Sequence, residues 1–224
     1  MKDLIMEYDN LITGPYLNSQ DKNPEMLIIF LHGWGSNGND LIQLAPFFAQ
    51  SFPKAHFLSP HGPEECPQNP FEGKQWFGLD FNMDGTINRD NMPQKVKNAS
   101  EYVKNFINYW QKEYSIDKNQ TYLIGFSQGS MVALEIGSKI ILGGLLCYSG
   151  SFINNNYPLS KDNKIMLIHG ELDDTIPINN MQNAKNSLLT LGADVESYIC
   201  KDLAHSINEE GIKIGIEFLK KCNI

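Results

Sequence analysis

At residues 121–137 the sequence reads TYLIGFSQGSMVALEIG. The apolar run 122–124 is typical of a buried strand, and the run 130–136 is typical of a helix. Between them, GFSQG at 125–129 is a G-x-S-x-G pattern in the strand, sharp turn and helix context that a nucleophile elbow requires. Glycines are needed there because side chains would clash where the strand and helix backbones come close. We therefore predict that Ser127 projects above a sheet, with its amide at a helix start that favours an anion.

Strand-length apolar runs recur along the chain and alternate with stretches of helical spacing. This alternation predicts an α/β fold with a mostly parallel, twisted central sheet and helices on both of its faces. The clearest helices are expected at 93–114 and 207–221, and residues 4–12 are a weaker candidate for an antiparallel edge strand. The expected strands are 26–31, 122–124, 145–148, 165–168 and a more edge-like run at 195–200.

Length, composition and charge limit the classes of function. The 224 residues, 42% of them hydrophobic, fit one domain spanning 1–224 with a core that needs no disulfide or structural metal. The net charge is −8 and Arg89 is the single arginine, which argues against a nucleic-acid partner. No run approaches the ~20 apolar residues of a membrane span, and the first residues do not resemble a signal peptide. We therefore expect no membrane span and a cytoplasmic location.

Cofactor and metal motifs are not found. The four cysteines are widely spaced, without a C-x-x-C pair, and are expected to be free thiols. The glycine-rich segment 33–38 lacks the lysine and spacing of a P-loop, and no acidic ribose partner follows it. We expect neither a cofactor nor a metal ion.

A serine nucleophile needs a base, and the chain offers five histidines: His32, His56, His61, His169 and His205. Two of them, His32 and His169, precede a glycine at the end of an apolar strand, where a histidine more often braces a loop. His56 and His61 precede Ser127, against the serine, acid, histidine order of this type of elbow. His205 is therefore the predicted base.

The acid and the oxyanion donors are expected on loops that follow strands. Asp173 and Asp174 both lie between Ser127 and His205 in the chain, and spacing alone does not separate them. LHGWG at 31–35 follows the first central strand. The backbone amides of Trp34 and Gln128 are the predicted oxyanion donors. The alternative is that this glycine-containing loop only turns the chain.

Together these motifs resemble the phospholipase/carboxylesterase family of small α/β-hydrolases, which contains bacterial carboxylesterases and the acyl-protein thioesterases. The resemblance spans residues 26–221, and it implies an α/β-hydrolase fold without a large lid. The family's triad aspartate stands four residues before a proline, here Pro177, which implies that Asp173 is the acid. Leucine is common in the family where this chain has Trp34, and proline is common where it has Asp174. The motifs are LHGWG (31–35), PHGP (60–63), QWF (75–77), GFSQG (125–129), HG (169–170) with Asp173 and Pro177, and HSI (205–207).

The long irregular region 60–93 is expected to be functional, because loops of this length in compact domains usually are. By the family resemblance, and because apolar side chains on such a loop suit an acyl chain, Trp76, Phe77 and Leu79 are expected to form one wall of the acyl pocket.

The sequence thus predicts a serine hydrolase that cleaves carboxylic esters of short to medium acyl chain through an acyl-enzyme. In it Ser127 attacks, His205 is base and then acid, and Asp173 orients His205. Three alternatives stay open: an acyl-protein thioesterase, a lysophospholipase, and a catalytically silent scaffold that binds an apolar ligand. The expected partner is a small ester or acylated substrate. A homodimer is a further possibility, since some relatives dimerise.

Overall fold

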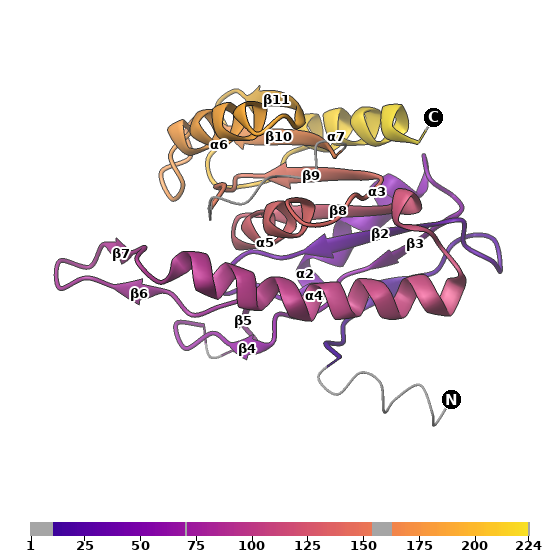
Figure 1. Cartoon of the computed structure of the whole chain (residues 1–224), viewed down its shortest axis with the longest axis horizontal. Coiled ribbons are helices and arrows are strands. Elements are labelled where there is room, and N and C mark those ends of the chain that lie inside the picture. The colour runs from indigo at the N-terminus through magenta and orange to yellow at the C-terminus, as the bar shows by residue number, and fades with distance from the viewer. Residues whose placement is uncertain (1–10, 70, 154–162, 224) are drawn as a thin grey trace.

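The computed structural model describes residues 11–69, 71–153 and 163–223, and a seven-stranded sheet forms its centre (Figure 1). The strand order is β1-β3-β2-β8-β9-β10-β11. Strand β1 pairs antiparallel with β3, and all other neighbours in this sheet are parallel. The strands are β1 (Tyr16–Leu17), β2 (Met26–Leu31), β3 (Ala55–Leu58), β8 (Thr121–Phe126), β9 (Gly144–Tyr148), β10 (Lys164–Gly170) and β11 (Asp194–Cys200). The predicted α/β class is confirmed.

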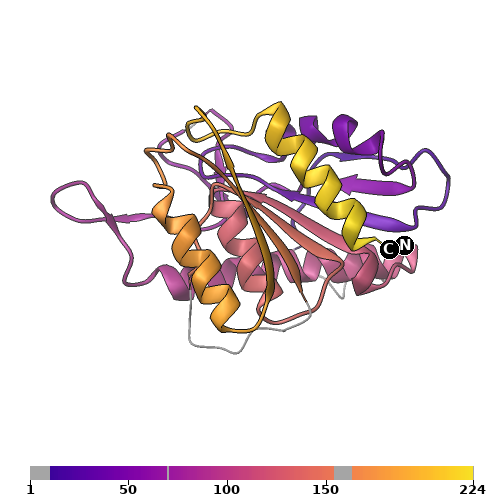
Figure 2. The ribbon, with the colours of Figure 1, turned by 90° about the horizontal axis from the view of Figure 1, so that it is seen from above.

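Helices cover both faces of the sheet, as Figure 2 shows from above. One face packs against α4 (Met92–Tyr114), α5 (Gln128–Gly137) and α6 (Asn179–Thr190), and the other against α2 (Gly38–Leu41), α3 (Ala45–Ala49) and α7 (Glu209–Cys222). Two 3₁₀ turns, Ile42–Leu44 and Lys118–Gln120, join these elements.

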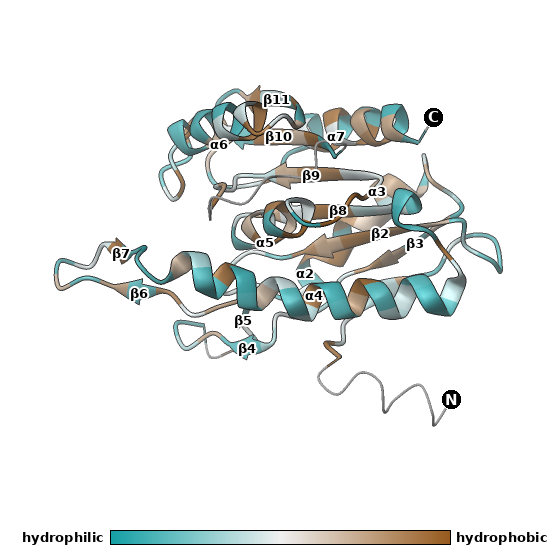
Figure 3. Ribbon diagram, in the orientation of Figure 1, coloured by the Kyte–Doolittle hydropathy of each residue, from teal (hydrophilic) through white to brown (hydrophobic). Residues whose placement is uncertain are grey.

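Burial on both faces explains why the central strands are apolar along their whole length. In β2, Leu27 and Ile29 enter the core cluster that contains α4, while Ile28 and Phe30 enter the cluster that contains α7. The hydropathy colouring shows the same division, with hydrophobic strands inside and many hydrophilic residues along the helices (Figure 3).

Some elements differ from the sequence prediction. Strand β3 was not predicted because it is only four residues long and contains His56, which is buried against the rings of Trp110 and Tyr114. The antiparallel edge strand is Tyr16–Leu17, after the expected segment 4–12, of which residues 4–10 lie outside the described residues.

The region 60–93 holds two small antiparallel hairpins before α4 begins. Strand β4 (Glu64–Glu65) pairs with β5 (Lys74–Gln75), and β6 (Asp80–Phe81) pairs with β7 (Ile87–Asn88). The β6–β7 hairpin projects from the body of the molecule in both ribbon views (Figures 1 and 2).

The carboxyl ends of the parallel strands meet at one edge of the sheet, where open α/β sheets usually bind their ligands. Every catalytic residue predicted from the sequence lies at or just beyond such a strand end. No helix in the described part of the chain is long and apolar enough to cross a membrane.

Candidate active site

Ser127 lies in a strained turn between β8 and α5. Its φ of 53° and ψ of −113° are unusual for a residue with a side chain, and its amide donates to the carbonyl of Tyr148 at 2.9 Å. A Cβ at Gly125 would overlap the backbone of Ser130, and a Cβ at Gly129 would overlap the carbonyl of Leu31. The close approach predicted for these two glycines is therefore present, and it holds the turn in its strained form.

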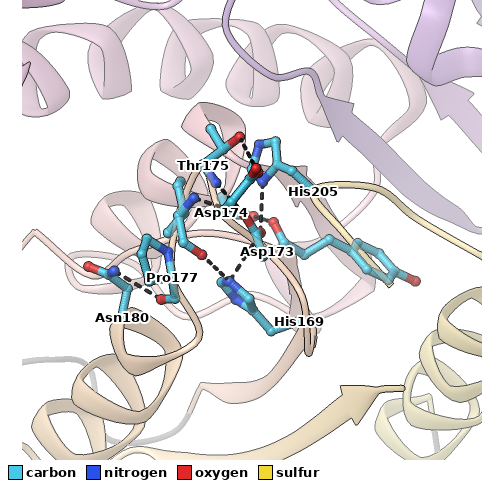
Figure 4. A network of polar contacts seen from close by, with 10 residues as sticks. His169, Asp173, Asp174, Thr175, Pro177, Asn180 and His205 are labelled. Atoms are coloured by element: carbon cyan, nitrogen blue, oxygen red, sulfur yellow. Dashed lines mark hydrogen bonds and ion pairs between the residues drawn. The ribbon is translucent and has the colours of Figure 1, made fainter. Parts of the chain in front are cut away.

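Asp173 and His205 form a hydrogen-bonded pair next to this turn (Figure 4). Nδ1 of His205 lies 2.8 Å from Oδ2 of Asp173, while Oδ1 accepts from the amides of Thr175 at 3.1 Å and Ile176 at 2.8 Å. Burial by itself would raise the pKa of Asp173. The hydrogen bonds from His205 and Ile176 outweigh burial and hold this pKa below its ordinary value. The structure thus brings an ionised carboxylate to His205, whereas the neighbouring Asp174 is exposed.

His169 is a second histidine that contacts the carboxylate of Asp173. It is buried near the end of β10, and its Nε2 lies 2.7 Å from the carbonyl oxygen of Ile176 and 3.2 Å from Oδ2 of Asp173. A carbonyl oxygen can only accept, so Nε2 must carry the hydrogen. His169 therefore donates into the acid loop, which is the bracing role expected for it, and both histidines face one carboxylate oxygen (Figure 4).

His32 occupies the corresponding place on the other side of Ser127, directly after β2. Its Nδ1 lies 2.8 Å from the carbonyl oxygen of Gly33, and its Nε2 accepts from the amide of Gly62 at 2.8 Å. Burial lowers the pKa of His32 to about 4. The imidazole is therefore neutral at pH 7, and it fixes the loop that carries Trp34.

Gln128 links the elbow to the loop between the two hairpins. Its side-chain Oε1 accepts from the amide of Trp76 at 2.8 Å, and its Nε2 donates to the carbonyl of Phe77 at 2.8 Å. The indole of Trp76 donates in turn to the carbonyl of His32 at 2.8 Å. The backbone amide of Gln128 lies in the first turn of α5, where amides have no partner within the helix. The side chain thus fixes the residue whose amide is the predicted oxyanion donor.

A cavity of about 330 Å³ opens beside Ser127. Most of its wall is apolar, and it includes His205. Its lining residues are Gly33, Trp34, Ser36, Asp40, Leu41, Leu44, Phe126, Ser127, His205, Ser206 and Ile207.

The three residues expected to form an acyl wall lie elsewhere. Trp76 and Phe77 are buried and line a second cavity of about 340 Å³ together with Glu64 and Tyr102, and Leu79 packs against the core beneath α4. Their hydrogen bonds to Gln128 and His32 draw the backbone of this loop inward. The structure therefore does not bring Trp76, Phe77 or Leu79 to the cavity beside Ser127.

Cysteine thiols and clusters of acidic or histidine side chains are the groups that most often bind metal ions in proteins. All four cysteines are free, as predicted. Within residues 11–69, 71–153 and 163–223, no group of three His, Cys, Asp or Glu side chains is arranged to hold a metal ion.

Comparison with known proteins shows which family this chain belongs to. The sequence model described as Phospholipase/Carboxylesterase matches residues 13–223. The chain belongs to this family. It is 29% identical to esterase YpfH of Escherichia coli (strain K12) over 96% of this chain and 89% of that protein. It is 23% identical to acyl-protein thioesterase 1 homolog 1 of Dictyostelium discoideum over 94% and 96% of the two chains.

Solved structures agree with the family assignment. The crystal structure of esterase PE8 superposes with a TM-score of 0.85 at 30% identity and covers 95% of this chain and 99% of that one. The Bacillus cereus carboxylesterase, at 18% identity and a TM-score of 0.76, covers 99% and 100% and shows the same fold. This member of the phospholipase/carboxylesterase family is therefore a hydrolase with the α/β-hydrolase fold.

Sequence reasoning missed two contributors to the site of this phospholipase/carboxylesterase family member. The side chain of Gln128 clamps the loop at Trp76, and Asp40 lies in the wall of the cavity beside Ser127. The glutamine inside GFSQG was a usable signal, because a large polar residue between elbow glycines must find partners if it is buried. No local sequence pattern indicates a role for Asp40, because it comes to the cavity only through the path that the chain takes after β2.

Proposed function

We propose that this enzyme cleaves carboxylic esters of short to medium acyl chain through an acyl-enzyme formed on Ser127. The observation that carries the proposal is the pair formed by the buried Asp173 and the half-buried His205, 2.8 Å apart, whose histidine lines one cavity with the strained Ser127. A silent scaffold has no need of a strained serine beside an acid–base pair, so these features favour the enzyme.

Each residue has a defined role in the proposed reaction. His205 donates its Nδ1 hydrogen to Asp173, which leaves Nε2 free to take the proton of Ser127 as the serine oxygen attacks the carbonyl carbon. The backbone amides of Trp34 and Gln128 stabilise the oxyanion. His205 then protonates the leaving alcohol, and water activated by the same histidine releases the acid. Asp173 stays ionised and stabilises the imidazolium throughout.

The substrate alternatives remain part of the proposal. The similarity to a protein named acyl-protein thioesterase supports trying a thioester, and the family description supports trying a lysophospholipid. Rates on a p-nitrophenyl ester series, an S-palmitoyl peptide and lysophosphatidylcholine would rank the three classes. We also propose a single domain over 1–224 and a cytoplasmic location, the latter in keeping with four free cysteines.

The nucleophile is tested with Ser127→Ala and with Ser206→Ala, a matched control in the same cavity. We expect Ser127→Ala to abolish fluorophosphonate labelling and to lower p-nitrophenyl butyrate hydrolysis by at least about 10⁴-fold, with an unchanged circular dichroism spectrum. Ser206→Ala should retain labelling and activity. Full activity in Ser127→Ala would contradict the proposal, and a wild type that reacts with no activated ester would favour the silent scaffold.

A further inference from the structure

The cavity beside Ser127 carries one fixed charge. Of the described residues that line it, only Asp40 is acidic and none is lysine or arginine. The other residues that line the cavity are mostly apolar, and they include the aromatic residues Trp34 and Phe126 and the aliphatic residue Leu44. An isolated negative charge in an apolar, aromatic wall is suited to a cation.

The role of Asp40 in its own helix does not explain this charge. Asp40 lies in the first turn of α2, but α2 has only four residues, and Asn37 already caps it by accepting from the amides of Asn39 and Asp40. The Asp40 side chain is exposed, and its Oδ2 accepts from the hydroxyl of Ser36 at 2.7 Å. No ion pair among the described residues involves Asp40. The carboxylate is therefore oriented by Ser36 and available to a ligand.

Asp40 lines the same cavity as Ser127 and His205, which places its carboxylate near the reacting atoms. Burial is the main cause of the lowered pKa of His32, and the negative charge of Asp40 acts in the opposite direction. The indole N–H of Trp34 donates to Oε1 of Gln75 at 2.8 Å, which anchors the ring, and Trp34 is one of the residues that line the cavity. An aromatic ring together with a carboxylate is the usual recognition site for an ammonium group.

We propose that this cavity selects esters or thioesters whose leaving alcohol or thiol carries an ammonium or quaternary ammonium group. The inference rests on the proposed function. The leaving group is assigned to this cavity because His205, which must protonate the leaving atom, lines it. In the acylation step the bond from Ser127 Oγ to the carbonyl carbon forms and the bond to the leaving oxygen or sulfur breaks. The proton of Ser127 passes through His205 to that leaving atom, so the charge of the ammonium group is unchanged.

The test uses two esters of the same shape, butyrylcholine and 3,3-dimethylbutyl butyrate, in which a carbon replaces the charged nitrogen. The measured quantity is the quotient of their kcat/KM values, cationic over neutral. We expect this quotient to fall roughly fivefold in Asp40→Asn, which keeps an acceptor for Ser36 but removes the charge. In the wild type the quotient should also fall with added salt, because Asp40 is exposed.

The matched control is Asp194→Asn, which changes the net charge equally. Asp194 is exposed and begins β11, so it lies at the sheet edge opposite the site. Its quotient should equal that of the wild type. A fall of the same size in Asp194→Asn would attribute the preference to the overall charge and overturn the inference.

A second pair of esters tests the assignment to the leaving group. It places the charge on the acyl side, as p-nitrophenyl 4-(trimethylammonio)butyrate and p-nitrophenyl 5,5-dimethylhexanoate. Dependence on Asp40 in this pair alone would overturn the assignment, and equal quotients in wild type and Asp40→Asn for both pairs would overturn the whole inference. Failure of the proposed function is distinguishable, since it would show as no hydrolysis of p-nitrophenyl butyrate by the wild type.

Discussion

The two sides of Ser127 are built on the same dipeptide, a histidine followed by a glycine at the end of a buried strand. On the oxyanion side, Nε2 of His32 accepts a hydrogen bond from the amide of Gly62. On the acid side, Nε2 of His169 lies against the carbonyl oxygen of Ile176 and must donate. The hydrogen therefore sits on Nδ1 in one ring and on Nε2 in the other. Identical local sequences thus hold their loops by opposite hydrogen bonds, because the partner of His32 is an amide of a distant segment and the partner of His169 is a carbonyl of the loop that follows its own strand.

The difference has an electrostatic consequence. His32 is buried, and its Nε2 is already used as an acceptor, so protonation would cost both solvation and a hydrogen bond. His169 faces the carboxylate of Asp173, and its role requires only that Nε2 keeps the hydrogen that it donates. The stability of the oxyanion side should therefore decrease at low pH. The activity that depends on the side with Asp173 should decrease when the donor of His169 or the carboxylate of Asp173 is removed.

The largest effect is expected from the carboxylate of the acid side. Asp173→Asn should lower kcat by about 10³- to 10⁴-fold, because an amide cannot both hold His205 in its tautomer and stabilise the imidazolium. The matched variant Asp174→Asn changes an exposed side chain and should alter kcat by less than about twofold. Steady-state kinetics on p-nitrophenyl butyrate measure both variants. The reverse ranking would transfer the role of the acid to Asp174.

An intermediate effect on stability is expected from the oxyanion side. The pKa of His32 is about 4 in the folded protein against an ordinary value of 6.5, so as the pH falls the unfolded chain takes up the proton first. The free energy of unfolding should therefore decrease as the pH falls from 6.5 to 4. Protonation of His32 alone should lower it by about 2 kcal/mol between pH 7 and pH 5. His56, whose pKa burial also lowers to about 4, should add a similar loss.

The measurement is the free energy of unfolding in urea at pH 7 and pH 5, for wild type and His32→Gln. Glutamine can still accept from the amide of Gly62, so the variant should lose only about 1 kcal/mol at pH 7. Between pH 7 and pH 5 the free energy of unfolding of His32→Gln should change by about 2 kcal/mol less than that of the wild type. An undiminished pH dependence in His32→Gln would show that this histidine is not the group being protonated.

The smallest effect is expected from His169. His169→Phe removes the donor and should lower kcat about tenfold with little change in KM, because Asp173 loses one of the groups that orient it. His169→Gln keeps an N–H donor and should retain activity to within about threefold. Titration of active sites with a fluorophosphonate corrects both rates for unfolded enzyme. Equal losses in the two variants after that correction would argue against a positioning role for the donor.

Much of this architecture was readable from local patterns. The elbow at Ser127 follows from GFSQG because the strand, turn and helix are consecutive in the chain and Gly125 is crowded by the backbone of Ser130, while Gly129 is crowded by the backbone of Leu31 on the neighbouring strand. The strands at 26–31 and 165–168 were recognisable because burial on both faces makes them continuously apolar. Strand β3 was not predicted because His56 interrupts its apolar pattern. In the structure the ring of His56 packs against aromatic side chains of α4.

The site itself was only partly readable. Asp173 and Asp174 are adjacent in sequence and differ in the structure by burial and by a partner 32 residues away. The aromatic residues Trp76 and Phe77 were expected to line the acyl pocket, but their backbones are bound by the Gln128 side chain and the rings are buried. Contacts of this kind depend on which loops meet at the sheet edge, and no local pattern records that.

The sequence by itself thus determined the class of the fold, the elbow, and the order of serine, acid and histidine along the chain, because these depend on backbone geometry and on contacts between neighbouring residues. Tertiary structure decided which carboxylate meets His205, which nitrogen of His32 and of His169 carries the hydrogen, and that Asp40 faces the cavity of Ser127. The contacts of His205 and His32 arise where parallel strands bring segments tens of residues apart within hydrogen-bonding distance, and the contact of His169 depends on the course of the loop after β10. Only the folded chain fixes those distances.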